Sequence, residues 1–492
     1  MVDSFSIDAD DDIATQERST RFARKQFGKG LEILTVPRAS FPLGACWAAL
    51  LMAAAVPAVS AGEAAETVVH VDASKEYQVI QGFGAACSFW RRENEVAYRS
   101  PEFQKLLIND LGLSILRFEV NPGLQQEPDL DADALDLSRF DFNALKTAGQ
   151  LAQALSQRAP GQVKVICSIW SPPAWMKTNN ATRGGGNLRT DRYAQFAKYC
   201  AGLCLGFEKT YGVPVYAMSL QNELVFVEPY DSCVYSPETI RDVTRTVGEA
   251  FKKWKVSTKL MGNEDVGCGT WFRYMQYAKP TLDDAGQYLS FLCIHGYAGD
   301  GKTPSTNRDN WTALRRKLEP YRRELWMTET SGDPPDTWAG GINVATHIHE
   351  ALVYGGCSAW VYWQLTNPFD AGKESLCVDG APTPKYYAVK HYARFVRPGA
   401  IQVSAAPDSP GLGVSAFVHK KDRTITVVLI NSPDSERPVQ LDIQAPWEVA
   451  SFERYVSSAR EMCATQPPLK AAQHTVTLTL PRRSIVTLVG RG

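Results

Sequence analysis

The sequence predicts an α/β protein, a (β/α)8 TIM barrel with a C-terminal β-sandwich domain lying side by side with it. Strand-like apolar segments alternate with helix-like segments up to about residue 363, which is the pattern of a barrel. After Arg397-Pro398-Gly399 the pattern changes to short strands without helices between them. The 492 residues exceed one small domain and suit a large barrel plus a second module.

The barrel is predicted from eight short apolar segments. They lie at 78–86, 114–120, 163–169, 215–222, 259–264, 289–295, 324–328 and 358–363. One intervening helix is predicted to begin after Ser236, a capping residue, with Pro237 at the first helical position. Apolar residues then recur at helical spacing from Ile240 to Phe251. Another helix is expected from Thr190 through Phe207.

The β-domain is predicted from segments that turn residues separate. They lie at 414–419, 424–431, 439–443, 475–480 and 484–489. A further strand, 67–71, precedes the barrel and is expected to join this domain. We therefore divide the mature chain into 62–80 as the joining segment, 81–396 as the barrel and 397–492 as the β-sandwich.

The segment 1–61 has the features of a signal peptide with a long polar lead. An apolar run over 43–56 is followed by the small-residue cleavage pattern Pro57-Ala58-Val59-Ser60-Ala61. A translation start nearer Val36 and a short anchor helix are the alternatives, although the run is shorter than the roughly 18 residues of a usual span. We expect cleavage after Ala61, secretion or export to the periplasm, and no stable membrane association afterwards.

Charge and cysteine usage exclude several classes of protein. With 52 Lys+Arg against 53 Asp+Glu, no strong field favours nucleic acid or anionic membranes. No CxxC pair indicates zinc, and Gly82-Phe83-Gly84 lacks the third glycine of a dinucleotide loop. Cys167, Cys293 and Cys357 lie in apolar strands as small hydrophobic residues. In an exported protein others are candidates for oxidation, namely Cys233, Cys268 and Cys377.

Two glutamates each close an apolar strand, Glu223 at the end of the fourth and Glu329 at the end of the seventh. A carboxylate at the mouth of a buried strand carries a desolvation cost that a structural role seldom requires. A barrel brings these strand ends together, and two carboxylates are the minimum equipment for breaking a glycosidic bond.

Six ordered motifs resemble glycoside hydrolase family 30, from about residue 67 to the C-terminus. They are Gln81-Gly82-Phe83-Gly84-Ala85, Ile115-Leu116-Arg117, Trp170-Ser171-Pro172-Pro173-Ala174-Trp175-Met176-Lys177, Gln221-Asn222-Glu223, Trp326-Met327-Thr328-Glu329, and Tyr386 through Arg397-Pro398-Gly399. The resemblance implies a barrel fused side by side with the β-domain. It also implies that Glu223 is the general acid/base and Glu329 the nucleophile of a retaining glycosidase.

The roles place opposite demands on the two carboxyls. Glu223 must be protonated at rest, which requires a raised pKa, whereas Glu329 must stay ionised. The resemblance makes Arg117 the cation beside Glu329, and Asn222 a donor to the sugar 2-hydroxyl. Pairing with a loop carboxylate is the alternative for Arg117. Two carboxylates and a pocket suffice for this reaction, so we expect no metal and no cofactor.

Aromatic and imidazole side chains complete the predicted site. In the family's His-x-Tyr arrangement, Tyr297 is expected to hydrogen-bond Glu329 and His295 to touch the sugar or its neighbours. Three tryptophans are candidates for stacking against a pyranose ring, Trp170, Trp175 and Trp363. For Trp363 the alternative is a cap on the barrel core.

Two departures from the family pattern narrow the expected substrate. Leu224 stands where many relatives have proline, which removes no functional group. The segment 362–367 lacks the arginines with which glucuronoxylan-specific members hold a uronate. We therefore expect the substrate to be plain xylan, β-1,6-glucan or β-1,6-galactan, as a polysaccharide or oligosaccharide. We also expect the protein to be a monomer. Glucosylceramidase activity is the alternative, and a carbohydrate-binding pseudoenzyme is a third, which both glutamates argue against.

Overall fold

The computed structural model describes residues 66–492, apart from 89–92, 129–130, 132–133, 268–270, 299–307, 335–336, 370–371 and 408–409. The signal peptide predicted at 1–61 lies outside the described residues, as does Cys268. Among the described helices, none is both long and apolar enough to cross a membrane.

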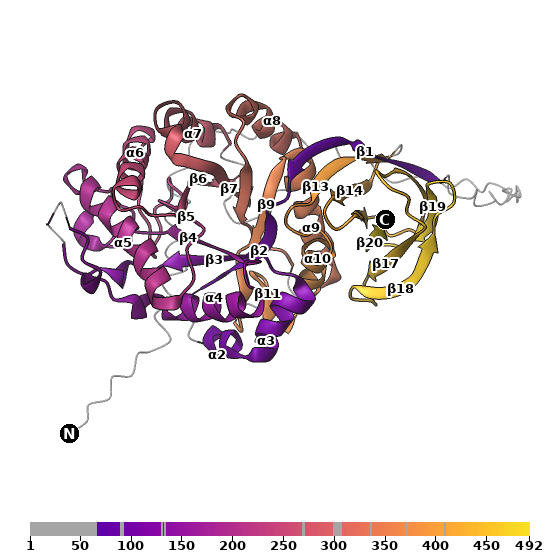
Figure 1. The fold of residues 1–492 in the computed structure, drawn as a ribbon, viewed down its shortest axis with the longest axis horizontal. Coiled ribbons are helices and arrows are strands. Elements are labelled where there is room, and N and C mark those ends of the chain that lie inside the picture. Colours follow the sequence, from indigo (N-terminus) through magenta and orange to yellow (C-terminus); the bar gives the residue numbers. More distant parts are fainter. Residues whose placement is uncertain are drawn as a thin grey trace, which may run out of the picture. The chain divides into compact units, whose positions relative to one another are not determined.

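Eight parallel strands close into a barrel, as predicted (Figure 1). Their order around the barrel follows the chain. The strands are β2 Gly82–Cys87, β3 Ile115–Val120, β4 Lys164–Ile169, β5 Ala217–Ser219, β6 Lys259–Gly267, β7 Leu289–Tyr297, β8 Leu325–Glu329 and β9 Cys357–Tyr362. Each overlaps one of the eight apolar segments, so the alternation in the sequence corresponds to the barrel.

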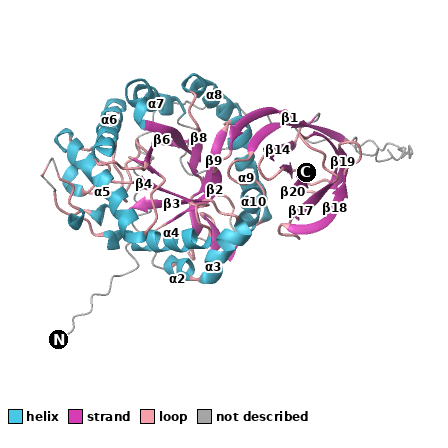
Figure 2. Ribbon diagram, viewed as in Figure 1, coloured by secondary structure: helices cyan, strands magenta, loops and turns pink. Residues whose placement is uncertain are grey.

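Helices surround the barrel (Figure 2). They are α2 Asn94–Arg99, α3 Pro101–Lys105, α4 Lys146–Arg158, α5 Tyr193–Tyr211, α6 Pro237–Lys253, α7 Trp271–Ala285, α8 Arg308–Leu318, α9 Trp338–His349 and α10 Pro384–Ala393. At the start of α6 the Ser236 side chain accepts a hydrogen bond from the Thr239 N–H, which satisfies one orphan donor of the first turn. The same helix buries Ile240, Val243 and Val247.

Apolar residues form separate cores inside and outside the barrel. Side chains alternate across a strand, so every second residue faces the interior. The interior holds one cluster, which consists of Ile115, Ile166, Ala217, Met261, Phe291, Cys293, Trp326, Ala359 and Val361. The Trp326 ring stacks on Phe291 with centroids 4.2 Å apart. A larger cluster, which includes Phe118, Phe207 and Val247, fills the layer between strands and helices.

The second domain is a nine-stranded mixed sheet in the order β18-β17-β20-β15-β14-β13-β1-β16-β19. Its strands are β1 Thr67–Val79, β13 Ile401–Pro407, β14 Leu412–His419, β15 Thr424–Asn431, β16 Arg437–Gln444, β17 Ser451–Ser457, β18 Ala464–Lys470, β19 Thr475–Leu480 and β20 Ser484–Arg491. The two end strands, β18 and β19, approach each other, so the sheet nearly closes around its own core. Three of these strands, β13, β17 and β18, have no counterpart among the predicted ones.

The first described strand belongs to this C-terminal sheet. β1 runs antiparallel to β13 and parallel to β16, with Val69 opposite both Pro407 and Leu441. In Figure 1 the indigo strand β1 lies among the orange and yellow strands of the C-terminal region. Its far end leads into the barrel, where the Gln81 N–H donates to the carbonyl of Ser358 in β9 over 2.6 Å.

The three thiols placed in apolar strands, Cys167, Cys293 and Cys357, are buried and free. Cys233 and Cys377, named as candidates for oxidation, are also free and buried. Burial raises the pKa of the Cys233 thiol to about 11, which keeps it protonated near neutral pH.

Candidate active site

A polar layer lies directly above the apolar interior of the barrel. Ile115, Ile166, Cys293 and Trp326 belong to the interior cluster. Two residues further along the same strands are four fully buried polar residues, Arg117, Ser168, His295 and Thr328. Since the side-chain period of a strand is two, the strands that bury apolar residues inside also aim these polar groups at the carboxyl end of the barrel.

The two predicted glutamates meet at this end. Glu223 follows β5, and its backbone N–H donates to the Glu264 carbonyl over 2.9 Å. Its φ of 51° lies in the left-handed region, which non-glycine residues seldom adopt and which clusters at functional sites. Carboxylate oxygens of Glu223 and Glu329 lie within 4.8 Å of each other, and a ring nitrogen of His295 completes the cluster.

Both oxygens of Glu329 are engaged by predicted neighbours. Arg117 Nη1 donates to Oε2 over 2.5 Å, and the Tyr297 hydroxyl donates to Oε1 over 3.0 Å. Burial and the negative charge of Glu329 raise the pKa of Tyr297 well above its usual value, so its hydroxyl keeps its proton. A cation and a neutral donor thus contact one oxygen each, which fixes the orientation of the carboxylate that is the candidate nucleophile.

Arg117 also fixes the orientation of Asn222. Its Nη2 lies 2.8 Å from Asn222 Oδ1, and because a guanidinium has only donors, the amide must turn its oxygen toward it. The Asn222 Nδ2 group is then left as a donor for a ligand. Arg117 Nε completes the set by donating to Ser168 Oγ over 3.3 Å.

Glu264 is a buried partner of Arg117 that the sequence reasoning missed. Its Oε1 lies 3.4 Å from Arg117 Nη2 and accepts from Thr328 Oγ1 over 2.6 Å. Burial alone would raise the pKa of Glu264, but Arg117, His295 and Thr328 outweigh it and hold the pKa well below the usual range. Arg117 thus sits between two carboxylates, one at the site and one beneath it.

His295 lies among three carboxylates. Its Nδ1 is 3.0 Å from Glu223 Oε1 and 3.8 Å from Glu329 Oε1, while Nε2 is 3.4 Å from Glu264 Oε1. Burial opposes its protonation, yet the charge of Glu329, hydrogen bonds to Glu223 and Glu264, and the charge of Glu264 raise the pKa of His295 to about 10. The side chain is fully buried, and in the absence of a sugar its contact is with the acid/base candidate Glu223.

Glu223 has the raised pKa expected of a general acid. Burial is the largest cause, Glu329 adds to it, and the hydrogen bond from His295 opposes it. The two carboxyls therefore occupy different environments, with the cation of Arg117 bound directly to Glu329 only. Such a difference between the environments of two carboxyls is how one site supplies both an acid and a nucleophile.

The three tryptophans differ in what they contact. Trp170 is only 6% exposed, and its ring packs against the Arg117 guanidinium at 4.7 Å and against Trp363 at 5.7 Å. Trp363 is half-buried and keeps more surface for a ligand. Trp175 is half-buried too, but its described contacts run to the Gln125 carbonyl and to Arg192, and none of them reaches the carboxylates.

Two loops beside Glu223 are joined by a buried lysine. Lys177 Nζ donates to Ser171 Oγ and the Thr182 carbonyl over 3.0 Å each, and to the Ser232 carbonyl over 2.6 Å. Burial lowers the pKa of Lys177. These bonds connect the loop after β4 to the loop after β5, which carries Glu223.

The loop after β5 also carries Tyr230, another residue that the sequence reasoning missed. Tyr230 is 51% exposed. The pKa of its hydroxyl is raised, first by partial burial and then by the charges of Glu228, Glu223 and Glu329. The sequence did offer a signal for Tyr230, because it is an aromatic residue on the loop that carries the predicted catalytic Glu223. The effect of Glu223 and Glu329 on its pKa indicates that Tyr230 lies near these carboxylates.

The cluster of Glu223, His295 and Glu329 is also the one described set of side chains with the spacing of a metal site. Arg117 already supplies positive charge to Glu329 at 2.5 Å. The donor set therefore fits a pair of catalytic carboxyls without requiring a cation.

Comparisons with known proteins agree with this geometry. A model described as the glycosyl hydrolase family 30 TIM-barrel domain matches residues 125–312. A glucuronoxylanase of Bacillus subtilis is 26% identical over 454 residues, 89% of this chain and 94% of that protein. An endo-1,6-beta-D-glucanase of Neurospora crassa is 24% identical over 420 residues, 75% of this chain and 82% of that protein.

The fold has close counterparts among solved structures. The family 30 subfamily 8 xylanase of Clostridium acetobutylicum superposes with a TM-score of 0.71 at 24% identity, covering 86% of this chain and 99% of that one. The barrel, the attached β-domain and the family match together confirm the resemblance carried by the sequence motifs. Residues 125–312 thus match the barrel domain of glycoside hydrolase family 30, a family of retaining glycoside hydrolases, and the chain as a whole is similar to its members.

Proposed function

We propose that this protein is a secreted hydrolase that cleaves a β-linked polysaccharide by double displacement, with Glu329 as nucleophile and Glu223 as acid/base. The observation that carries the proposal is the distance of at most 4.8 Å between oxygens of the two glutamates. Retaining enzymes hold their carboxyls about 5–5.5 Å apart, whereas inverting enzymes need about 6.5–9.5 Å to admit a water molecule between carboxyl and sugar.

In the first step Glu329 attacks the anomeric carbon while Glu223 transfers its proton to the leaving glycosidic oxygen. The carbon–oxygen bond breaks, and the sugar remains as an ester on Glu329. In the second step Glu223, now ionised, takes a proton from water, and the water oxygen displaces Glu329 from the anomeric carbon. The second inversion restores the β configuration, and both carboxyls return to their starting protonation states.

The neighbours of the two glutamates support these steps. Arg117 and Tyr297 hold Glu329 at both oxygens, which aims it and favours its charge. His295 Nδ1 contacts Glu223 and also lies near Glu329. It can therefore hydrogen-bond Glu223 in both the protonated and the ionised state of this acid. Asn222 offers Nδ2 to the sugar 2-hydroxyl, a contact that strengthens in the transition state.

Two observations together narrow the set of candidate substrates. Relatives at about a quarter identity are named a glucuronoxylanase and an endo-1,6-beta-D-glucanase, and a solved structure of similar fold is named a xylanase. The segment after β9, from Trp363 to Asn367, contains no arginine that would hold a uronate. We therefore favour plain xylan, β-1,6-glucan or β-1,6-galactan over glucuronoxylan.

The test is product analysis of residues 62–492 against plain xylan, glucuronoxylan, β-1,6-glucan, β-1,6-galactan and glucosylceramide. We expect oligosaccharides from one of the three favoured polysaccharides, and proton NMR should show the β-anomer as the first product. Glu329→Gln keeps the size of the side chain and removes the nucleophile, so it should abolish turnover. An α-anomer as the first product would exclude double displacement, and release of ceramide alone would replace the polysaccharide assignment.

A further inference from the structure

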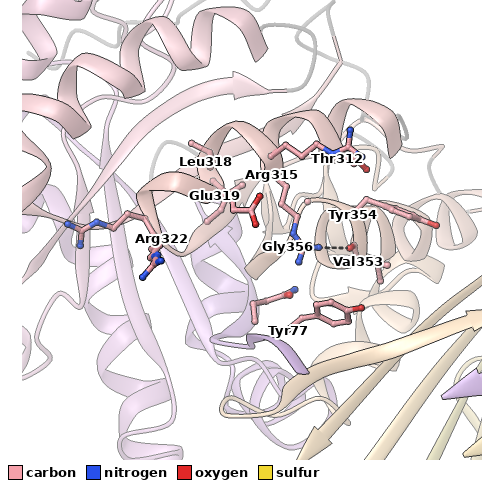
Figure 3. Close-up of a pocket in the computed structure, with 14 residues that line it drawn as sticks. Tyr77, Thr312, Arg315, Leu318, Glu319, Arg322, Val353, Tyr354 and Gly356 are labelled. Carbon is pink, nitrogen blue, oxygen red and sulfur yellow. Dashed lines mark hydrogen bonds between the residues drawn. The ribbon is translucent and has the colours of Figure 1, made fainter. Parts of the chain in front are cut away.

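A pocket of about 500 Å³ opens at the end of the barrel opposite the catalytic carboxylates. It is lined by Leu325, which begins β8, whereas Glu329 ends the same strand. Gly355 and Gly356, just before β9, line it as well, together with Tyr77 from β1. Figure 3 shows this hollow between α8, the turn before β9 and β1.

The lining of the pocket is strongly basic. Four arginines contribute to it, Arg315, Arg316, Arg322 and Arg323, against the single acid Glu319. Two helical segments end here, at Leu318 and Tyr354, and each helix C-terminus adds roughly half a negative charge. Glu319 and both termini together offset about two of the four positive charges, so the pocket keeps a positive balance.

These arginines differ from three exposed arginines elsewhere on the barrel. Arg99, Arg189 and Arg241 each pair with a carboxylate. Within the described part of the chain, none of the four pocket arginines forms an ion pair, although Glu319 is close by. Like charges gathered without counter-charges repel one another, and a bound anion would relieve that repulsion.

Part of the arginine cluster is held in place. Arg315 Nη1 donates to the Val353 carbonyl over 3.3 Å, the bond drawn in Figure 3, and Arg323 Nη2 donates to the Gly286 carbonyl over 3.2 Å. Arg322 has a φ of 49°, a left-handed backbone that glycine would adopt more readily. At this position Arg322 caps the helical turn Glu319–Tyr321, and its backbone N–H donates to the Glu319 carbonyl.

An aromatic wall accompanies the charges. Tyr77 is 45% exposed, and the Arg315 guanidinium lies 5.6 Å from the centre of its ring. Tyr354 stands on another side of the pocket, as Figure 3 shows. Guanidinium forks match the two oxygens of a carboxylate, and an exposed tyrosine ring packs against the apolar face of a sugar. The volume is within the usual range of about 300–1,000 Å³ for small-molecule sites.

We propose that this pocket is a non-catalytic binding site for a carboxylate-bearing sugar, such as a uronic acid unit of an acidic polysaccharide. The carboxylate contacts the guanidiniums of Arg316 and Arg322, the two pocket arginines whose side chains have no described hydrogen bond to the chain, and the sugar ring packs on Tyr77. The site lies at the opposite end of β8 from Glu329, so it anchors the enzyme to an acidic glycan while the other end of the barrel stays open. This inference does not depend on which bond the enzyme cleaves.

The test uses residues 62–492 with glucuronate, glucose and inorganic phosphate as separate probes at low salt, followed by ligand-observed NMR. Glucuronate and glucose differ only in the carboxylate, so their difference isolates the charge. The pocket variants are Arg316→Gln with Arg322→Gln, and Tyr77→Ala with Tyr77→Phe as its ring-retaining match. Arg482→Gln removes an exposed arginine of the β-domain and controls for general charge.

We expect glucuronate to bind and glucose not to. The double arginine variant should raise the Kd for glucuronate at least about tenfold. Tyr77→Ala should weaken binding, whereas Tyr77→Phe and Arg482→Gln should leave it unchanged. Glucuronate binding that survives the double arginine variant, or no binding in the wild type, would overturn the proposal. If phosphate binds as tightly as glucuronate and Tyr77→Ala leaves the Kd for glucuronate unchanged, the sugar assignment is overturned and the pocket is a simple oxyanion site.

Discussion

Replacing Arg117 by methionine should both stop catalysis and destabilise the fold, because one guanidinium serves two buried carboxylates. Arg117 and Glu264 are 0% and 1% exposed, and Glu329 is 7% exposed. Removing one partner of a buried ion pair typically costs about 3–5 kcal/mol, since the remaining charge is left unpaired in a poorly polarisable interior. We expect a loss of this size in the free energy of unfolding, measured by urea titration with tryptophan fluorescence.

The pH dependence identifies Glu264 as the origin of the loss. Arg117 helps to hold the pKa of Glu264 well below its usual range, so this carboxylate contributes stability above its unfolded pKa of about 4.3. That contribution is lost as the pH falls through the folded pKa. The gap between wild type and Arg117→Met should therefore be widest near neutral pH and should narrow in acid, where Glu264 in the variant takes up a proton.

A double variant separates stability from catalysis. Adding Glu264→Gln to Arg117→Met removes the unpaired charge, so it should restore part of the lost stability. Activity should not return, because Glu329 and Asn222 still lack their guanidinium. Arg117→Lys keeps the charge without the fork and should fall between the two. The reasoning fails if Arg117→Met unfolds at the wild-type urea concentration, or if Glu264→Gln makes it less stable still.

Three further predictions concern the acid, its neighbour and a helix cap. Glu223→Ala should lose about 10²–10⁴-fold in rate on substrates with poor leaving groups and far less on activated aryl glycosides; equal losses would place the proton donor elsewhere. The raised pKa of Glu223 means that kcat/KM falls as the pH rises through it, and His295→Gln should move this alkaline limb to higher pH by removing a hydrogen bond that lowers the pKa. An unmoved limb would contradict that coupling. Ser236→Ala should cost about 1 kcal/mol of stability in urea titration with kcat unchanged, because it removes the cap of α6.

The barrel was predictable because its strands are short apolar runs separated by helical patterns. The strands missed in the β-domain carry weaker signals. β18 contains Pro467 and Pro468, which argue against a strand, yet β18 ends the sheet order, where proline is tolerated. β17 carries Glu453 and Arg454 in its middle, which hides the alternation of a half-buried strand.

The site shows why strand counting has a limit. Counting in twos from Met261, an interior residue, would turn Asn263 and Asp265 inward rather than Glu264. The register of β6 against β7 shifts between Gly262 and Asp265, and this irregularity changes the phase of the strand. A bulge of this kind depends on the neighbouring strand, so the sequence of β6 alone does not reveal the buried carboxylate. The pairing of Arg117 with Glu329 was accessible because both residues stand in motifs that carry the family resemblance, Ile115-Leu116-Arg117 and Trp326-Met327-Thr328-Glu329.

The path of β1 has a consequence for how the chain is made. Thr67 pairs with Val439, so the first described strand waits for partners that leave the ribosome only after the whole barrel has been synthesised. Until then β1 presents an unpaired edge, a state that favours aggregation and slows folding. The β-domain is therefore not a contiguous stretch of the gene. A fragment that begins at residue 397 lacks the strand between β13 and β16, and a designer who wants this domain alone must supply residues 67–79 as a separate or permuted segment.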